Sequence, residues 1–228
     1  MSTSLSPSAR TTLTRHSERG SHDRADLLAV LGEALVCHVG IVRDGEPVVL
    51  PAVHGVDPEG PDEGGTLYLH GSVAAPWLVQ APEQTVCATF TLVDGAVLAR
   101  TAFGHSMNYR SAVVYGAARR VDDPAERDRA LRLIVDHVVP GRSATLRAST
   151  RKELAATAVL AVSLHEASLK LREGGVGDEP EDVEAGTWAG VLPLRMVAGE
   201  LEVDPLTSAP VPDDVAARVA QLRPSDGQ

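Results

Sequence analysis

Histidine is the side chain in this sequence best suited to metal binding or to proton transfer near neutral pH. The chain has eight histidines, and no two of them stand at the i, i+4 spacing that places a pair of imidazoles on one face of a helix. His38, His54 and His70 fall in separate apolar segments with the character of strands. A His/His/carboxylate metal site across neighbouring strands is therefore one interpretation, although our prediction for the chain is no metal.

The short motifs that usually reveal cofactor or hydrolase chemistry are missing. No G-x-G-x-x-G follows the first strand, and there is no G-x-x-x-x-G-K-[ST], H-E-x-x-H, C-x-x-C or G-x-S-x-G. These motifs work because their spacing fixes a phosphate, a zinc ion or a nucleophilic serine. Their absence removes the common nucleotide-binding, zinc and serine-hydrolase interpretations.

Charge and composition narrow the possible partners. The 228 residues carry a formal net charge of −10, which argues against binding to nucleic acid or to a membrane surface. Part of the negative charge is concentrated at 178–184, so a local basic site for a phosphate stays possible. Residues 1–20 lack the apolar run of a secretory signal, and no stretch is long enough to span a bilayer. We expect a cytoplasmic protein whose two cysteines, Cys37 and Cys87, are free thiols.

The elements that must position any site are mostly short strands. Asp44-Gly45 and Asp94-Gly95 each separate two β-like runs, which predicts two hairpins. Asp23 and Asp123 are typical helix caps, and Ser72 is the expected cap of a short helix distorted by Pro76. The expected strands are 36–43, 48–53, 66–70, 85–93, 96–103, 111–121, 156–164, 167–172 and an apolar segment at 188–196. The expected helices begin at 24, 73, 124 and 151, with a late helical turn at 215–222.

This order predicts a mainly β protein. Six or more antiparallel strands with hairpin links, two or three helices and no βαβ repeat favour a closed or partly open antiparallel barrel decorated by helices.

Several segments, taken in order, carry a family resemblance. They are VCHVGIVRDGEPVVLPAVHGV, GTLYLHGSVAAPWLVQAPEQTVCATFTLVDG, FGHSMNYRSAVVYGAARRVDDPAERDRAL, SLKLREG and TWAGVLPL. Over residues 20–195 the chain resembles the flavin-binding split-barrel family, in the branch of pyridoxamine 5'-phosphate oxidase-like and nitroimidazole-resistance-protein-like members. The resemblance implies an antiparallel split β-barrel of the FMN-binding type. It also implies a homodimer with two FMN sites at the subunit interface, and a flavin-dependent oxidoreductase that acts on a small molecule.

The resemblance further implies a division of the chain and a set of site residues. The expected parts are a flexible arm (1–20), the barrel domain (21–197) with an acidic linker or lid (174–186) inside it, and an extended tail (198–228). A flavin would lie beside the second strand of the first hairpin, with its phosphate near the end of a later strand. The implied cofactor-binding residues are Val49, Leu50, Pro51, His70, Gly71, Ser72, Asn108, Tyr109, Arg110, Ser111, Lys170, Arg172 and Trp188, and His70 is also the candidate catalytic residue.

Phosphate chemistry makes this set reasonable, with one departure. A flavin phosphate favours Arg or Lys, hydroxyls and helix N-terminal amides, and Ser72 at a helix start would combine the last two. However, Ala75 and Pro76 stand where family members usually carry basic phosphate-binding residues. Phosphate binding would then rest on Ser72, Arg110, Lys170 or Arg172.

Several alternatives follow from this departure. The chain could be a non-catalytic flavin-, deazaflavin- or haem-binding regulatory protein of the same fold. Arg110 could pair with an acid, Lys170 and Arg172 could form a solvated edge, and Trp188 could be a packing residue. True pyridoxamine-phosphate oxidase activity is disfavoured, because a second phosphate would need more basic residues than the chain provides.

Overall fold

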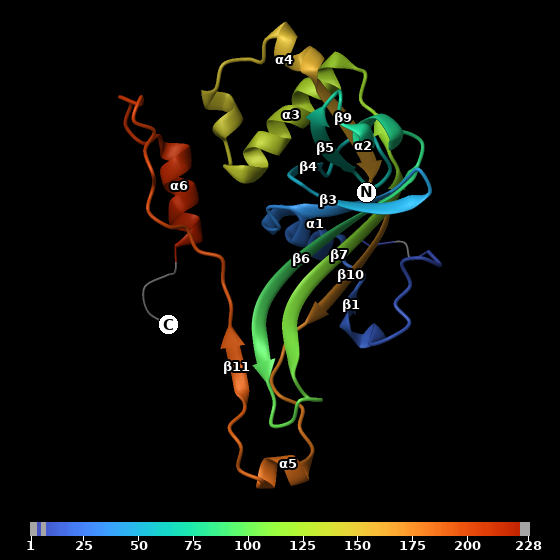
Figure 1. The fold of residues 1–228 in the computed structure, drawn as a ribbon, viewed down its shortest axis with the longest axis vertical. Coiled ribbons are helices and arrows are strands. Elements are labelled where there is room, and N and C mark those ends of the chain that lie inside the picture. Colours follow the sequence, from blue (N-terminus) through green and yellow to red (C-terminus); the bar gives the residue numbers. More distant parts are fainter. Residues whose placement is uncertain (1–3, 6–7, 224–228) are drawn as a thin grey trace.

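The protein is built from two antiparallel sheets with helices around them, as expected for a mainly β chain (Figure 1). We describe it from a computed structural model, which covers residues 4–5 and 8–223. The seven-stranded sheet runs β1-β10-β7-β6-β2-β3, and β11 also pairs with β6. Its strands are β1 (Gly20–Ser21), β2 (Cys37–Arg43), β3 (Glu46–Ala52), β6 (Thr85–Leu98), β7 (Ser106–Ala117), β10 (Glu166–Arg172) and β11 (Gly190–Pro193).

The second sheet is smaller and has the order β4-β5-β9-β8. Its strands are β4 (His54–Asp57), β5 (Thr66–Ser72), β8 (Arg119–Arg120) and β9 (Thr157–Ser163). The helices are α1 (Arg24–Glu33), α2 (Pro76–Gln80), α3 (Pro124–Val138), α4 (Arg151–Ala156), α5 (Pro180–Glu184) and α6 (Asp213–Leu222), with 3-10 turns at Ser17–Arg19 and Arg142–Thr145. No helix within these described ranges is long and apolar enough to cross a bilayer.

Local signals placed several elements correctly. The Asp23 carboxylate accepts a hydrogen bond from the amide of Ala25 at 2.8 Å and so caps α1. The Asp123 carboxylate caps α3 in the same way, accepting from the amide of Glu126 at 2.7 Å. Asp44 and Gly45 join β2 to β3 with φ values of 55° and 83°, the left-handed pair that a tight hairpin turn requires.

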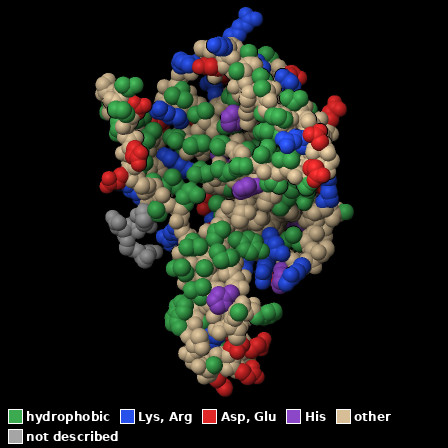
Figure 2. All heavy atoms as spheres, viewed as in Figure 1, with side chains coloured by type: hydrophobic (Ala, Val, Ile, Leu, Met, Phe, Trp, Pro, Cys, Tyr) green, Lys and Arg blue, Asp and Glu red, His purple; other side chains and the backbone are tan. Residues whose placement is uncertain are grey.

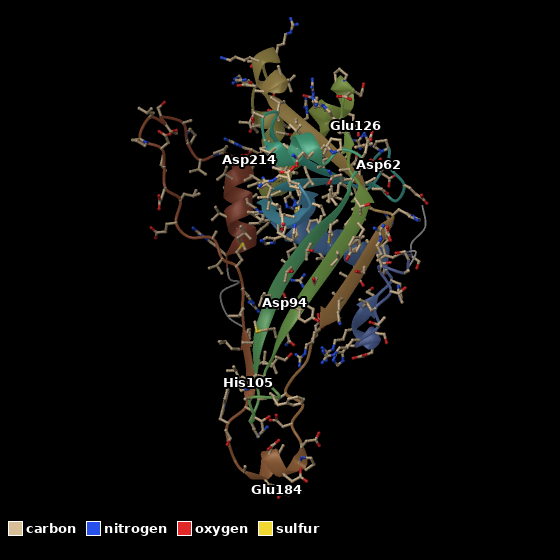
Figure 3. All side chains as sticks on the ribbon, turned by 45° about the vertical axis from the view of Figure 1, so that its right-hand side comes forward. Asp62, Asp94, His105, Glu126, Glu184 and Asp214 are labelled. Atoms are coloured by element: carbon tan, nitrogen blue, oxygen red, sulfur yellow. The ribbon has the colours of Figure 1, made fainter. Side chains whose placement is uncertain are left out.

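The second predicted hairpin turn, at Asp94-Gly95, is wrong. β6 runs straight through these two residues with a bulge between Val93 and Gly95. Figure 3 shows Asp94 part-way along the strand and His105 near the loop where the chain reverses. β11 approaches closely here, since a Cβ at Gly95 would lie 3.1 Å from the carbonyl oxygen of Leu192, which would have to shift by a few tenths of an ångström.

The predicted helix start at Ser72 is also wrong. α2 begins at Pro76 with Ala75 at the N-cap, and proline is favourable at this first position because the amide it lacks would have no partner in the helix. The Ser72 hydroxyl instead accepts a hydrogen bond from the amide of Ala74 at 3.2 Å. Ser72 therefore does not combine a hydroxyl with a helix N-terminus.

The main core lies between the two sheets and is completed by α1. Leu27, Phe90, Leu69 and Leu164 are fully buried in it. A second apolar cluster lies on the other side of the small sheet, under α3, and contains Tyr68, Ile134 and Ala161. Both cysteines are free thiols, as expected. The small sheet therefore has apolar contacts on both faces. Among the described residues, one face of the large sheet has no apolar cluster packed against it.

The two ends of the chain extend beyond this core. In the N-terminal arm Leu5 is buried and β1 pairs with β10, so part of the arm lies along the edge of the large sheet. After β10 the chain forms α5, β11 and α6, which Figure 1 shows as an orange-to-red segment beside the barrel. Asp178, in the expected acidic lid, is bonded to Arg100. The flexibility of the arm and the division into parts stay predictions.

Candidate functional site

One face of the large sheet, opposite α1, has no core against it, and we call it the outer face. Alternation along the paired strands defines it, because Val39, Phe90 and Val114 point to the core and their neighbours point away. The outer face consists of His38, Gly40, Val42, Val49, Pro51, Cys87, Thr89, Thr91, Val93, Tyr109, Ser111, Val113, Tyr115, Ser168, Lys170 and Arg172.

The outer face is apolar and open to solvent. Val42, Val49 and Val93 are 55%, 64% and 45% exposed. Figure 2 shows hydrophobic side chains gathered across the middle of this side of the molecule. Exposed apolar patches of this kind commonly mark ligand or partner sites.

Six of the predicted site residues lie on the outer face. They are Val49, Pro51, Tyr109, Ser111, Lys170 and Arg172. Leu50 points to the opposite face, since it pairs with buried Val39. Lys170 donates to the carbonyl oxygen of Arg15 at 2.9 Å, and Arg172 donates to the side-chain oxygen of Asn108. These two cations bond to neutral oxygens, so their charge stays available to an anion.

His70, Gly71 and Ser72 lie in the small sheet and are not brought to the outer face of the same chain. His70 pairs with Val159 and shares its side of β5 with Tyr68, under α3. Its Nδ1 is buried and has no hydrogen-bond partner among the residues that the structure describes. Burial lowers the pKa of His70, which favours the neutral imidazole. Gly71 has a packing role, because a Cβ there would lie 2.7 Å from Leu78 Cδ1.

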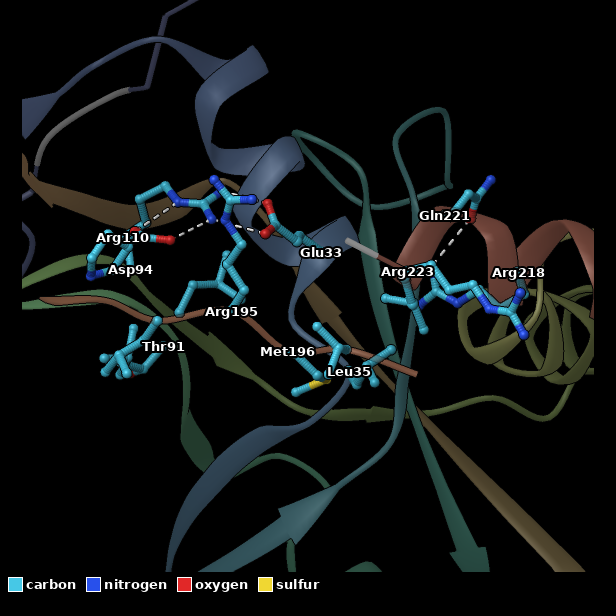
Figure 4. A pocket seen from close by; sticks show the side chains of 16 residues that line it. Glu33, Leu35, Thr91, Asp94, Arg110, Arg195, Met196, Arg218, Gln221 and Arg223 are labelled. Atoms are coloured by element: carbon cyan, nitrogen blue, oxygen red, sulfur yellow. Dashed lines mark hydrogen bonds and ion pairs between the residues drawn. The ribbon is translucent and has the colours of Figure 1, made fainter. Parts of the chain in front are cut away.

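Arg110 points to the α1 side and is paired with two acids. Its guanidinium donates to Asp94 and to Glu33, the last residue of α1, as the dashed lines in Figure 4 show. These hydrogen bonds raise the pKa of Arg110 further above its ordinary value. Arg110 is therefore already occupied by carboxylates, which is the alternative that the sequence left open.

A pocket of about 1000 Å³ opens beside this cluster, and we call it the tail pocket. It lies between β6, the end of α1, the chain after β11, and α6 (Figure 4). Its lining residues are Glu33, Leu35, Thr91, Leu92, Val93, Asp94, Arg110, Pro193, Leu194, Arg195, Met196, Val197, Arg218, Gln221, Leu222 and Arg223.

Sequence reasoning missed this pocket. Arg195 comes from the apolar segment expected at 188–196, and Arg218 and Arg223 come from the tail, which was expected to be extended with one late helical turn. No cluster of basic residues marks the pocket in the sequence, because these three arginines are spread along residues 195–223, which also carry five acids.

The three histidines considered for a metal point to three different places. His38 is exposed on the outer face, His70 lies under α3, and His54 is fully buried. His54 Nε2 lies 2.9 Å from the carbonyl oxygen of Leu31, and its ring centroid lies 4.1 Å from that of His137. Burial, with His137 nearby, lowers the pKa of His54 to about 4. In the described part of the chain no three His, Cys, Asp or Glu side chains could hold a metal together.

Trp188 lies between α5 and β11 and is 71% exposed. Its ring covers Gly190, where a Cβ would lie 2.9 Å from the indole. It is not part of the outer face or of the tail pocket in a single chain.

Comparisons with known proteins cover most of the chain. The family model of pyridoxamine 5'-phosphate oxidase matches residues 23–171. The flavocytochrome Anf3 from Azotobacter vinelandii is 34% identical, with a TM-score of 0.84, over 93% of this chain and 98% of that one. The FAD and heme binding protein from Mycobacterium smegmatis is 40% identical, with a TM-score of 0.80, over 88% of this chain and 97% of that one.

A more distant structure is a candidate 5-nitroimidazole antibiotic resistance protein from Bacteroides thetaiotaomicron. It is 25% identical, with a TM-score of 0.52, over 66% of this chain and 85% of that one. No curated protein matches the chain.

Proposed function

Because the chain belongs to the pyridoxamine 5'-phosphate oxidase family, with its split-barrel fold, we propose that it is a redox protein that binds a flavin together with haem. The observation that carries this proposal is the open apolar outer face, which adjoins a basic pocket. Two similar proteins, described as a flavocytochrome and as an FAD and heme binding protein, match most of this chain. They favour FAD over FMN, the flavin that the resemblance alone implied.

The residues of the outer face fit a flavin. A flat ring system needs an apolar surface with small side chains, which Gly40, Ser111 and Val113 provide. Val49, Pro51 and Tyr109 would lie along the ring, and Lys170 and Arg172 would supply positive charge. When bound, a flavin supplies the electron-transfer chemistry itself, so the chain's task is to bind, orient and exclude water.

Haem would need a ligand from the chain. His38 is the histidine that the outer face presents to solvent, and imidazole is a common axial ligand of haem. We therefore propose His38 for this role.

A homodimer is part of the proposal. The exposed valines of the outer face would be buried if two copies met there. His70 lies under α3, on the side of the small sheet that faces away from this interface, so this arrangement does not bring it to the cofactor.

A second candidate is a non-catalytic flavin- and haem-binding protein that stores or senses. The position of His70 under α3, away from the outer face of its own chain, favours it. Catalytic transfer of electrons from a reductant to a small-molecule acceptor by the cofactor-loaded protein would exclude this candidate.

The proposal is tested by titrating the cofactor-free protein with FAD, FMN and haemin. We expect Val113→Glu, on the outer face, to weaken flavin binding at least about tenfold, since it places a charge under the ring. Val138→Glu, on α3, is the matched control and should bind as the wild type does. Unchanged binding by a folded Val113→Glu would place the flavin elsewhere, and a wild type that binds no flavin would refute the proposal.

A further inference from the structure

The tail pocket has the features of an anion site, and we propose that it holds a diphosphate, taking the adenosine diphosphate end of FAD. The inference rests on the flavin binding proposed above and names the subsite that selects the dinucleotide form.

The pocket exists because the edge of β6 is interrupted. β2 pairs with β6 only at Cys87–Thr89, and β11 pairs with it only at Gly95–Leu98. Between these two partners, no strand of the described residues pairs with 91–93 on that side. The tail and α6 lie across the gap and leave a volume of about 1000 Å³, enough for a nucleotide.

The lining carries excess positive charge in an acidic protein. Four arginines face two carboxylates there, whereas the whole chain has a net charge of −10. Glu33 and Asp94 are both engaged by Arg110. Arg195 and Arg223 have no ion-pair partner among the described residues. Figure 4 shows them on opposite sides of the pocket, where each offers an unpaired guanidinium, the group that suits a phosphate.

Arg218 adds a more specific observation. Its Nη1 donates only to the side-chain oxygen of Gln221, at 3.3 Å, and its Nε is buried with no partner within residues 4–5 and 8–223. An unpaired buried donor costs free energy unless a ligand satisfies it. In Figure 4 Arg218 and Arg223 lie on the α6 side of the pocket, and Arg195 lies on the segment that follows β11.

The pocket also connects with the outer face. Thr91 and Val93 belong to both surfaces, because they lie on the outer face at the interrupted edge of β6. A ligand can therefore rest its ring on the sheet and place its anionic end among the arginines. Leu35, Met196 and Leu222 offer apolar contact for an adenine. Arg218 and Arg223 would thus provide the positive charge for phosphate binding that is absent at Ala75 and Pro76.

The test compares ligands that contain the flavin alone, the flavin with one phosphate, the flavin with adenosine diphosphate, or adenosine diphosphate alone. Wild type, Arg218→Gln, Arg223→Gln and the exposed control Arg151→Gln are titrated with FAD, FMN and riboflavin, and with ADP alone. We expect each pocket variant to lose about tenfold in affinity for FAD and for ADP, with riboflavin unchanged, and the control to match the wild type.

The outcomes separate this inference from the proposed function. FAD affinity that is equal in all four proteins would overturn the inference even if flavin binds. The same four proteins are also titrated with haemin, and a loss of haemin binding with FAD unaffected would overturn the inference and assign the arginines to haem carboxylates. ADP binding that depends on the arginines, in a protein that binds no flavin, would support the diphosphate site while refuting the flavin proposal.

Discussion

Arg110 and Asp94 face each other across the β6–β7 pair, and the guanidinium donates two hydrogen bonds to the carboxylate, at 3.0 and 2.8 Å. The same guanidinium holds Glu33 at the end of α1. Arg110 therefore ties the helix to the long hairpin. This arrangement assigns it a structural role beside the tail pocket, in contrast to the phosphate contact that the family resemblance implied.

Replacing Arg110 by methionine should destabilise the fold by about 1–2 kcal/mol, because two neighbouring carboxylates lose their shared partner. The pair is partly shielded, since the Arg110 side chain is only 25% exposed. Urea unfolding of Arg132→Met, which removes an exposed pair with Asp128 on α3, is the control and should change stability by less than about 0.5 kcal/mol. Equal effects of the two variants would contradict the structural role of Arg110.

Stability should fall as the pH is lowered from about 6.5 towards 4. The folded state holds the pKa of His54 near 4, below its ordinary value of 6.5, so in this window the unfolded chain binds the extra proton. The full effect is about 3 kcal/mol for this buried group. His137, whose pKa is also lowered by burial, acts with the same sign.

Denaturation midpoints measured across that pH range check this expectation. His54→Gln should flatten the slope whatever its own effect on stability, whereas Gly32→Ala in α1, which removes no titratable group, should keep it. A slope that His54→Gln leaves unchanged would mean that other groups cause it.

The outer face should govern the oligomeric state. Val49→Asp places a charge at a 64% exposed position on this face and should convert the proposed homodimer to a monomer. Val138→Asp on α3 serves as the control. Light scattering coupled to size exclusion gives the mass directly, and a dimer that survives Val49→Asp would exclude this face as the interface.

Gly95 should be needed to keep β11 on the sheet. A Cβ there would lie 3.1 Å from Leu192 O and from Val191 Cγ1, so Gly95→Ala should loosen β11 and speed amide exchange at 190–193. Gly32→Ala, in α1 with nothing within 4 Å, should leave that exchange unchanged and stabilise the fold by about 0.5–1 kcal/mol. Equal protection of β11 in both variants would show that the close approach is tolerated.

These residues also show what could be predicted from the sequence. The same dipeptide, Asp-Gly, forms a turn at 44–45 and a bulge at 94–95, because at the second position β11 and Arg110 decide the local geometry. Alternation along β7 was enough to separate Tyr109 and Ser111 from Arg110. The pairing of Arg110 with Glu33, 77 residues away, was not visible in any local pattern.

The tail pocket could not be predicted either, because it too depends on contacts between residues far apart in the sequence. It joins residues of α1, β6 and α6, and its existence depends on where two strands stop pairing with a third. The segment order, in contrast, was sufficient to predict the family and the antiparallel fold.

The most direct test of the central claim is the absorbance spectrum of the protein as purified, with the flavin and haem content determined per protomer. We expect both a flavin band and a haem Soret band, with FAD as the flavin released on denaturation. A colourless protein that takes up neither FAD nor haemin on titration would contradict it.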